Sequence, residues 1–155
     1  MEFSADKQKE FDTLLPRYPH KEAAMLPTLR LAQEEFGYVS SDVIEFVAGL
    51  LEVPVARVKA VASFYTMYDK KPVGKHHIQV CQNLSCSLMG CETIIEHLER
   101  KLGIKVGETT SDERFTLTRV ECLGACGTAP VMQINDDYYE DLTAEKVDKI
   151  LEGLK

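Results

Sequence analysis

The 155-residue sequence lacks the features that direct a chain into a membrane or onto nucleic acid. Its apolar runs are only a few residues long, whereas a membrane-spanning helix needs about 20. The opening residues are neither basic nor continuously apolar, so we expect no secretory signal. Acidic side chains outnumber basic ones by 25 to 18, which argues against nucleic acid or an anionic membrane as the main partner. We therefore expect an acidic, soluble, cytoplasmic protein that does not insert into a membrane.

Cysteine is absent from the first 80 residues, and its concentration in the second half is the most informative feature of the chain. The five positions are Cys81, Cys86, Cys91, Cys122 and Cys126. The charge is also uneven, because residues 1–75 carry 10 basic and 11 acidic side chains whereas residues 76–155 carry 8 and 14. In a reducing compartment, cysteines more often bind metal or carry out redox chemistry than form disulfides. The uneven distribution of cysteine and of charge predicts that the chain consists of two modules.

The first module, residues 1–70, is predicted to be an N-terminal helical bundle. Apolar residues recur at helical spacing before Gly37, after Ser40 and after Pro54, and a further amphipathic segment covers Phe3–Leu15. Three aromatic residues close this module and suit either the core or a partner interface, with the core as the usual location: Phe64, Tyr65 and Tyr68. The lysine-rich segment 71–75, with Pro72 and Gly74, is predicted to be a linker.

In the second module, residues 76–155, the pattern of apolar residues predicts both strands and helices. Short β runs precede Cys81 and Cys122, and a helix is expected over about 88–102 between them. Two more runs, joined by Asn135-Asp136, indicate a hairpin, and Thr143 is placed to cap a closing helix. The order β-α-β-β-α, with the first two strands parallel, is typical of a thioredoxin-like α/β layer.

Two cysteine pairs each follow a predicted strand, so both pairs can meet at one end of the sheet. Four residues separate Cys81 from Cys86, and three separate Cys122 from Cys126. Four thiolates suit tetrahedral zinc or an iron–sulfur cluster. Zinc sites favour two intervening residues, whereas known binuclear clusters include a four-residue gap. The spacing favours a [2Fe–2S] cluster and leaves a structural zinc module as the alternative.

The loops around the cysteines support an anionic cluster. Gly124 and Gly127 let backbone N–H groups approach sulfur, and Ser87 with the start of the following helix is expected to add donors beside Cys86. Reduction would add a negative charge to a module that is already acidic. We therefore predict a low reduction potential, on the order of −400 mV or below.

Other readings of the cysteines and histidines are weaker. A thiol–disulfide enzyme would need a Cys-x-x-Cys pair, which does not occur in the sequence. A Rieske centre would need two histidine ligands, and the four histidines are better interpreted as ordinary surface or helix residues. Cys91 is expected to be a small buried hydrophobe rather than a ligand. The sequence leaves open the isomer of the bond before Pro130.

The sequence resembles the NuoE family, the thioredoxin-like [2Fe–2S] subunits of bacterial NADH-quinone oxidoreductase (respiratory complex I). Relatives of this family serve NAD-linked hydrogenases and formate dehydrogenases, so the parent complex stays open. The matching stretches cover nearly the whole chain: Phe36-Gly37-Tyr38-Val39, Val61-Ala62-Ser63-Phe64-Tyr65-Thr66-Met67-Tyr68, Ile78-Gln79-Val80-Cys81 with Cys86, Glu121-Cys122-Leu123-Gly124-Ala125-Cys126, and Tyr138-Tyr139-Glu140-Asp141-Leu142-Thr143.

The resemblance implies a specific role for the chain. Cys81, Cys86, Cys122 and Cys126 would hold one [2Fe–2S] cluster. FMN and NADH would bind a partner flavoprotein subunit of the NuoF type, which carries its own [4Fe–4S] cluster. The chain would be an electron carrier without catalytic residues of its own, in the peripheral arm of a respiratory complex on the cytoplasmic face of the membrane. Because the helical module carries no candidate chemistry, we expect it to dock on the flavoprotein.

Overall fold

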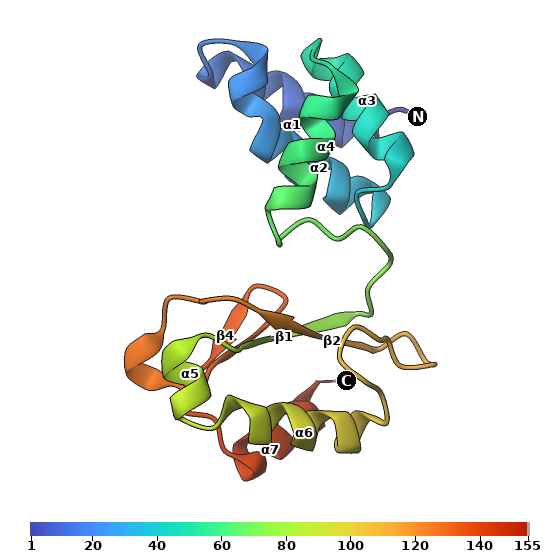
Figure 1. Cartoon of the computed structure of the whole chain (residues 1–155). Helices are drawn as coiled ribbons and strands as arrows, with labels where there is room; N and C mark the ends of the chain where they lie inside the picture. Colours follow the sequence, from blue (N-terminus) through green and yellow to red (C-terminus); the bar gives the residue numbers. More distant parts are fainter. Residues whose placement is uncertain (155) are drawn as a thin grey trace. The chain divides into compact units, whose positions relative to one another are not determined.

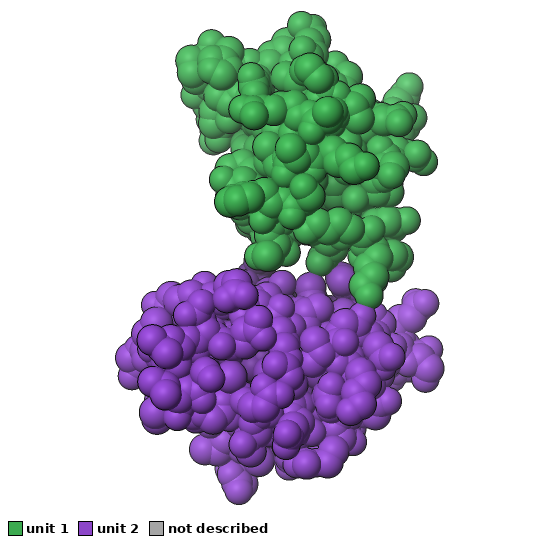
Figure 2. Space-filling view, viewed as in Figure 1, with its two compact units in different colours: residues 1–72 green, residues 73–155 purple. Residues whose placement is uncertain are grey.

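A computed structural model describes residues 1–154, which form two compact units. The units are Met1–Pro72 and Val73–Lys155, coloured separately in Figure 2. The division falls inside the segment 71–75 that the composition marks as a linker. Lys155, the last residue of the predicted domain 76–155, lies outside the described residues. Among residues 1–154, no helix is long and apolar enough to cross a bilayer.

The first unit contains four α-helices and two short 3-10 helices. Their bounds are α1 Ala5–Leu14, η1 Leu15–Arg17, η2 Lys21–Ala24, α2 Met25–Phe36, α3 Ser41–Leu51 and α4 Val55–Phe64 (Figure 1). The Ser40 side chain accepts a hydrogen bond from the Val43 N–H and so starts α3, as the sequence predicts. Pro27 lies in the first turn of α2, where a proline leaves the helix intact. Gly37, at φ 85°, ends that helix.

These helices bury one common core. Its fully buried members include Leu29 of α2, Val47 of α3 and Val58 of α4. Tyr68 is buried as well, and its hydroxyl donates to the Leu26 carbonyl at 2.8 Å. The usual core location therefore holds for Tyr68, whereas the side chains of Phe64 and Tyr65 are 77% and 37% exposed, which leaves the predicted alternative of a partner interface.

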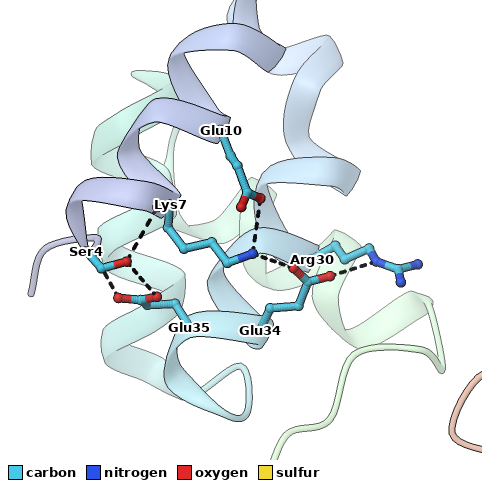
Figure 3. Close-up of polar contacts among 6 residues, drawn as sticks. All are labelled: Ser4, Lys7, Glu10, Arg30, Glu34 and Glu35. Carbon is cyan, nitrogen blue, oxygen red and sulfur yellow. Dashed lines mark hydrogen bonds and ion pairs between the residues drawn. The ribbon is translucent and has the colours of Figure 1, made fainter.

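A polar network links α1 to α2 across the surface of this unit (Figure 3). Lys7 Nζ lies 2.7 Å from Glu34 Oε2, and the other oxygen of this carboxylate, Oε1, accepts a hydrogen bond from Arg30 Nε at 3.0 Å. Ser4 donates to Glu35 from its backbone N–H and its hydroxyl, at 2.8 and 3.1 Å. The start of α1 is therefore attached to α2 by polar contacts as well as by the core.

The second unit is built on a four-stranded sheet in the order β2-β1-β3-β4. The strands are β1 His76–Cys81, β2 Phe115–Val120, β3 Met132–Ile134 and β4 Asp137–Tyr139. β1 and β2 are parallel, and β3 pairs antiparallel with both β1 and β4. The predicted parallel pair and hairpin are confirmed. Asn135 turns the hairpin at a positive φ of 54°.

In the described part of this unit, three α-helices and one short 3-10 helix accompany the sheet: α5 Leu84–Leu88, α6 Cys91–Leu102, η3 Cys126–Thr128 and α7 Ala144–Gly153. α6 and α7 lie side by side and cover one face of the sheet (Figure 1). The prediction of one helix over 88–102 is wrong at its start, because Gly90 adopts a left-handed conformation (φ 89°) that separates α5 from α6. Asn83 caps α5 as an independent helical turn. Thr143 caps α7 as predicted.

One histidine departs from the expected surface location. His76 is only 8% exposed, and its ring centroid lies 5.3 Å from that of Phe115. It begins a strand whose alternate residues face the core, and this alternation places it inside. His97 is a helix residue, as expected, and its Nε2 lies 2.9 Å from Asp148 Oδ1 on α7.

Candidate metal centre

The parallel pairing of β1 and β2 brings the two cysteine-bearing loops to one edge of the sheet. Cys81 is the last residue of β1 and lies in register with Val120, the last residue of β2. Cys122 follows two residues later. Since parallel strands end at the same edge, the first cysteine of each pair emerges there. The segment that follows β1 is still hydrogen-bonded to the end of β2, because the Gln82 N–H donates to the Val120 carbonyl at 3.0 Å.

The first pair is buried. Cys81 and Cys86 are each 2% exposed, and Cys86 lies on α5. Burial raises the pKa of the Cys86 thiol to about 11, and the hydrogen bond with the Cys81 side chain adds to this rise, while a backbone hydrogen bond with Val131 opposes it. Ligation of a metal by Cys86 therefore requires the release of a proton that the buried thiol holds firmly.

The second pair is exposed. Cys122 Sγ and Cys126 Sγ lie 3.8 Å apart, and the Gly124 N–H donates to Cys122 Sγ at 3.3 Å. Gly124 has a φ of 82°, which explains why this loop needs glycine. The expected N–H donor from this loop is confirmed. The expected donor at Ser87 is wrong, because that N–H lies inside α5 and donates to the Asn83 carbonyl.

The distance between the two exposed sulfurs fits ligation of one tetrahedral metal. Two thiolates on one tetrahedral metal, each bonded at about 2.3 Å, lie about 3.8 Å apart. The Cys122–Cys126 separation matches this value. Residues 1–154 contain no group of three or more His, Cys, Asp or Glu side chains that could hold a single metal ion. The Cys122–Cys126 distance therefore suits two ligands of one metal, either an iron of a [2Fe–2S] cluster or a zinc ion.

Cys91 lies close enough to the first pair to interact electrostatically with Cys81 and Cys86. It begins α6, is 2% exposed and belongs to the core of the second unit. Burial is the largest of several effects that raise the pKa of its thiol. This environment agrees with the predicted hydrophobic role, because a buried neutral thiol packs like a small apolar side chain.

The structure adds contacts around the cysteines that sequence reasoning missed. Glu121 accepts hydrogen bonds from the side chains of Gln82 and Asn83, and Tyr138 donates to the Leu123 carbonyl at 2.9 Å. The Ala129–Pro130 bond is cis. No periodic pattern marks these residues, and the only signal in the sequence is that Gln82, Asn83 and Glu121 lie next to or near a cysteine along the chain.

Apolar side chains are exposed on α5, the helix that carries Cys86. Leu84 is 71% exposed, Leu88 78%, and Met89, which follows the helix, 62%. Leu84 and Leu88 are four residues apart and therefore share one face of the helix. An exposed apolar group of this kind is typical of a protein interaction site.

Three comparisons identify similar proteins. The sequence profile of a family described as thioredoxin-like [2Fe–2S] ferredoxin matches residues 11–155. The chain is 51% identical over 144 residues to the E-type subunit of NADH-quinone oxidoreductase from Rickettsia felis, covering 91% of this chain and 86% of that protein. It is 45% identical over 148 residues to an E-type subunit of the same enzyme from Rhizobium meliloti, covering 96% and 88%.

A solved structure shares the fold. It is that of an NAD⁺-reducing [NiFe]-hydrogenase in the air-oxidized state, with a TM-score of 0.72 and 22% identity over 84% of this chain. The chain spans about a fifth of the length of that hydrogenase chain, since the match covers 22% of it.

Proposed function

This chain belongs to the family of thioredoxin-like [2Fe–2S] ferredoxins, and on that premise we propose that it is the NuoE-type electron-transfer subunit of an NADH-quinone oxidoreductase. The observation that carries the proposal is the arrangement of the cysteines as two pairs at one edge of the sheet, with the sulfurs of the second pair 3.8 Å apart. A bound [2Fe–2S] cluster supplies a site that accepts and donates one electron at a time.

The chain's own residues would perform three tasks at this site. Cys81 and Cys86 would hold the cluster through buried thiolates, and Cys122 and Cys126 through exposed ones. The Gly124 N–H, which donates to Cys122 Sγ, would stabilise the negative charge on sulfur. The exposed position of the second pair would leave one side of the cluster open to an electron-transfer partner.

We propose a flavoprotein subunit of the NuoF type, with FMN, an NADH site and a [4Fe–4S] cluster, as that partner. Its place would be beside this chain in the peripheral arm of the complex, on the cytoplasmic face of the membrane. The exposed apolar side chains on α5 support a contact beside the cluster site. Phe64, Tyr65 and Met67, also exposed, support a second contact through the helical unit.

The equivalent subunit of an NAD-linked hydrogenase or formate dehydrogenase is the second candidate. The fold likeness to the NAD⁺-reducing hydrogenase favours it. Isolating the complex from its native cells separates the candidates, because a hydrogenase would reduce NAD⁺ with hydrogen and a formate dehydrogenase with formate, whereas an NADH-quinone oxidoreductase would oxidise NADH with a quinone.

The test of the cofactor is a visible and EPR spectrum of the full-length chain, oxidised and then reduced with dithionite, with iron and labile sulfide counted. We expect a red-brown protein with about two irons and two sulfides per chain, and an S = 1/2 signal only after reduction. A colourless chain that binds zinc would refute the proposal and leave a structural module. Reactive thiols without any metal would also refute it, in favour of thiol chemistry.

The test of the partner uses the substitution Phe64→Ser. If the helical unit docks on the flavoprotein, loss of this exposed ring should weaken the complex by about tenfold, the effect of removing an aromatic anchor. Val55→Ser, at another exposed position of α4, is the matched control. Equal binding by wild-type and Phe64→Ser chains would count against docking through this side chain.

A further inference from the structure

A single carboxylate connects the two cysteine-bearing loops. Glu121 lies between the end of β2 and Cys122, and its two oxygens accept from different residues. Gln82 Nε2 lies 3.3 Å from Oε1, and Asn83 Nδ2 lies 3.1 Å from Oε2. Both donors belong to the segment that leads from Cys81 to Cys86. The side chain that precedes the second cysteine pair therefore holds the loop of the first pair.

Asn83 extends this connection to the helix that carries Cys86. While its Nδ2 donates to Glu121, its Oδ1 accepts from the Leu84 N–H at 2.8 Å and so begins α5. The Asn83 side chain has only these two polar groups, and both are engaged. A shift of the Glu121 carboxylate would therefore be passed through Asn83 to the first turn of α5.

Backbone hydrogen bonds between β1 and β2 do not connect the Cys122 loop to α5. The hydrogen bond from Gln82 N–H to the Val120 carbonyl joins the two strands at the end of the sheet. Beyond that point, Cys122 lies in an exposed loop and Cys86 lies on α5, two elements without a shared ladder. The Glu121 carboxylate provides a side-chain contact that spans them.

We propose that Glu121 is a positioning residue that sets the separation of the two cysteine pairs and, through its charge, lowers the reduction potential of the group they bind. The proposal rests on the proposed function, because it takes the four cysteines as ligands. An added electron is disfavoured by a nearby negative charge, so removing the Glu121 charge should raise the potential.

The experiment compares full-length Glu121→Ala and Glu121→Gln chains with the wild type. Iron loss to a chelator is followed by visible absorption, and the EPR spectrum and midpoint potential of the reduced form are recorded. Glu121→Ala should lose iron about fivefold faster, the effect of breaking an exposed hydrogen bond, and should show a broadened EPR spectrum. Glu121→Gln should raise the midpoint potential, because it removes the charge but keeps the size of the side chain.

Two further variants make the test specific. Glu96→Gln removes an exposed charge from α6 in the same unit and should leave all three measurements unchanged. Asn83→Ser keeps an oxygen that can cap α5 but lacks the amide donor to Glu121. If both residues act through one contact, the Asn83→Ser/Glu121→Ala double variant should lose iron no faster than the faster single variant.

The outcomes separate this proposal from the one on which it rests. A wild-type chain without iron overturns both. A wild-type chain with a [2Fe–2S] cluster, together with variants that match it in loss rate, EPR spectrum and potential, overturns the role of Glu121 alone. Additive effects in the double variant, or an equal change in Glu96→Gln, also contradict the positioning role.

Discussion

The five cysteine side chains occupy two environments, although the sequence distinguishes them only by spacing. Cys81, Cys86 and Cys91 are buried in the core of the second unit, whereas Cys122 and Cys126 are exposed. Burial alone therefore does not distinguish Cys91 from Cys81 and Cys86. Its position outside the two pairs does, and we expect it to contribute packing alone.

At the residue scale, we predict opposite effects for two cysteine substitutions. Cys91→Ala should keep the cluster spectrum and lower the free energy of unfolding by about 1 kcal/mol, because it removes one buried atom from the core. Cys122→Ser should abolish or strongly alter the EPR signal and change stability little in the iron-free chain, since its side chain is exposed. Chemical denaturation and EPR of both variants test this. Loss of the cluster in Cys91→Ala would make Cys91 a ligand.

At the scale of elements, α5 and α6 follow each other closely but contribute in different ways. α6 buries Ile94, Ile95 and Leu98 against the sheet, while α5 leaves its leucines exposed and places Cys86 inside. α6 therefore stabilises the core of the unit, whereas α5 positions Cys86 at the candidate metal centre.

Matched leucine substitutions test this division. Leu98→Ala should destabilise the chain by about 3 kcal/mol, because it leaves a cavity in the core. Leu88→Ala, the same change at a side chain that is 78% exposed, should change stability by less than about 0.5 kcal/mol. Denaturant unfolding of both chains measures the difference. Similar losses of stability in the two variants would contradict the assignment of α5 to the surface.

The attachment of α1 to α2 should depend on pH. The hydrogen bond from Lys7 is the largest cause that holds the pKa of Glu34 below its usual value of 4.5, and Arg30 adds to it against the effect of burial. Because the folded-state pKa is lowered, the ionised carboxylate contributes stability above pH 4.5 and loses it as the pH falls through the folded-state value.

Glu34→Gln should therefore lower the melting temperature by about 2 °C at pH 7, the size expected for an exposed ion pair, and by less below pH 4. Thermal unfolding of both chains at several pH values provides the measurement. A difference that grows in acid would have the wrong sign for this mechanism.

At the scale of the whole molecule, each unit has its own hydrophobic core. All five cysteines, the sheet and its covering helices belong to the second unit. The first unit contributes helices and exposed aromatic side chains. This distribution supports a division of labour between docking and electron transfer.

A chain that begins at Val73 should then keep the visible spectrum of the cluster and bind the flavoprotein subunit more weakly. Absorption spectra and co-purification of the shortened and full-length chains test the two halves of this prediction. Loss of the cluster on truncation would show that the helical unit supports the site itself.

Short-range patterns in the sequence were sufficient to predict the type of cluster, several helix starts and the hairpin. The cysteine spacing indicated a binuclear cluster, Ser40 and Thr143 marked helix starts, and Asn135-Asp136 marked the hairpin. These features depend on neighbours along the chain, so periodicity and capping rules could predict them. The parallel pairing of the first two strands could also be predicted from the sequence, because a helical crossover joins them.

Only the tertiary structure decided the remaining features. Phe64 is exposed, His76 is buried, and Glu121 contacts a loop 38 residues away. Each depends on what surrounds the residue in space, and no rule of spacing along the chain specifies that. The sequence therefore predicts which side chains bind the metal, while the fold determined which residues contact the segments that carry those side chains.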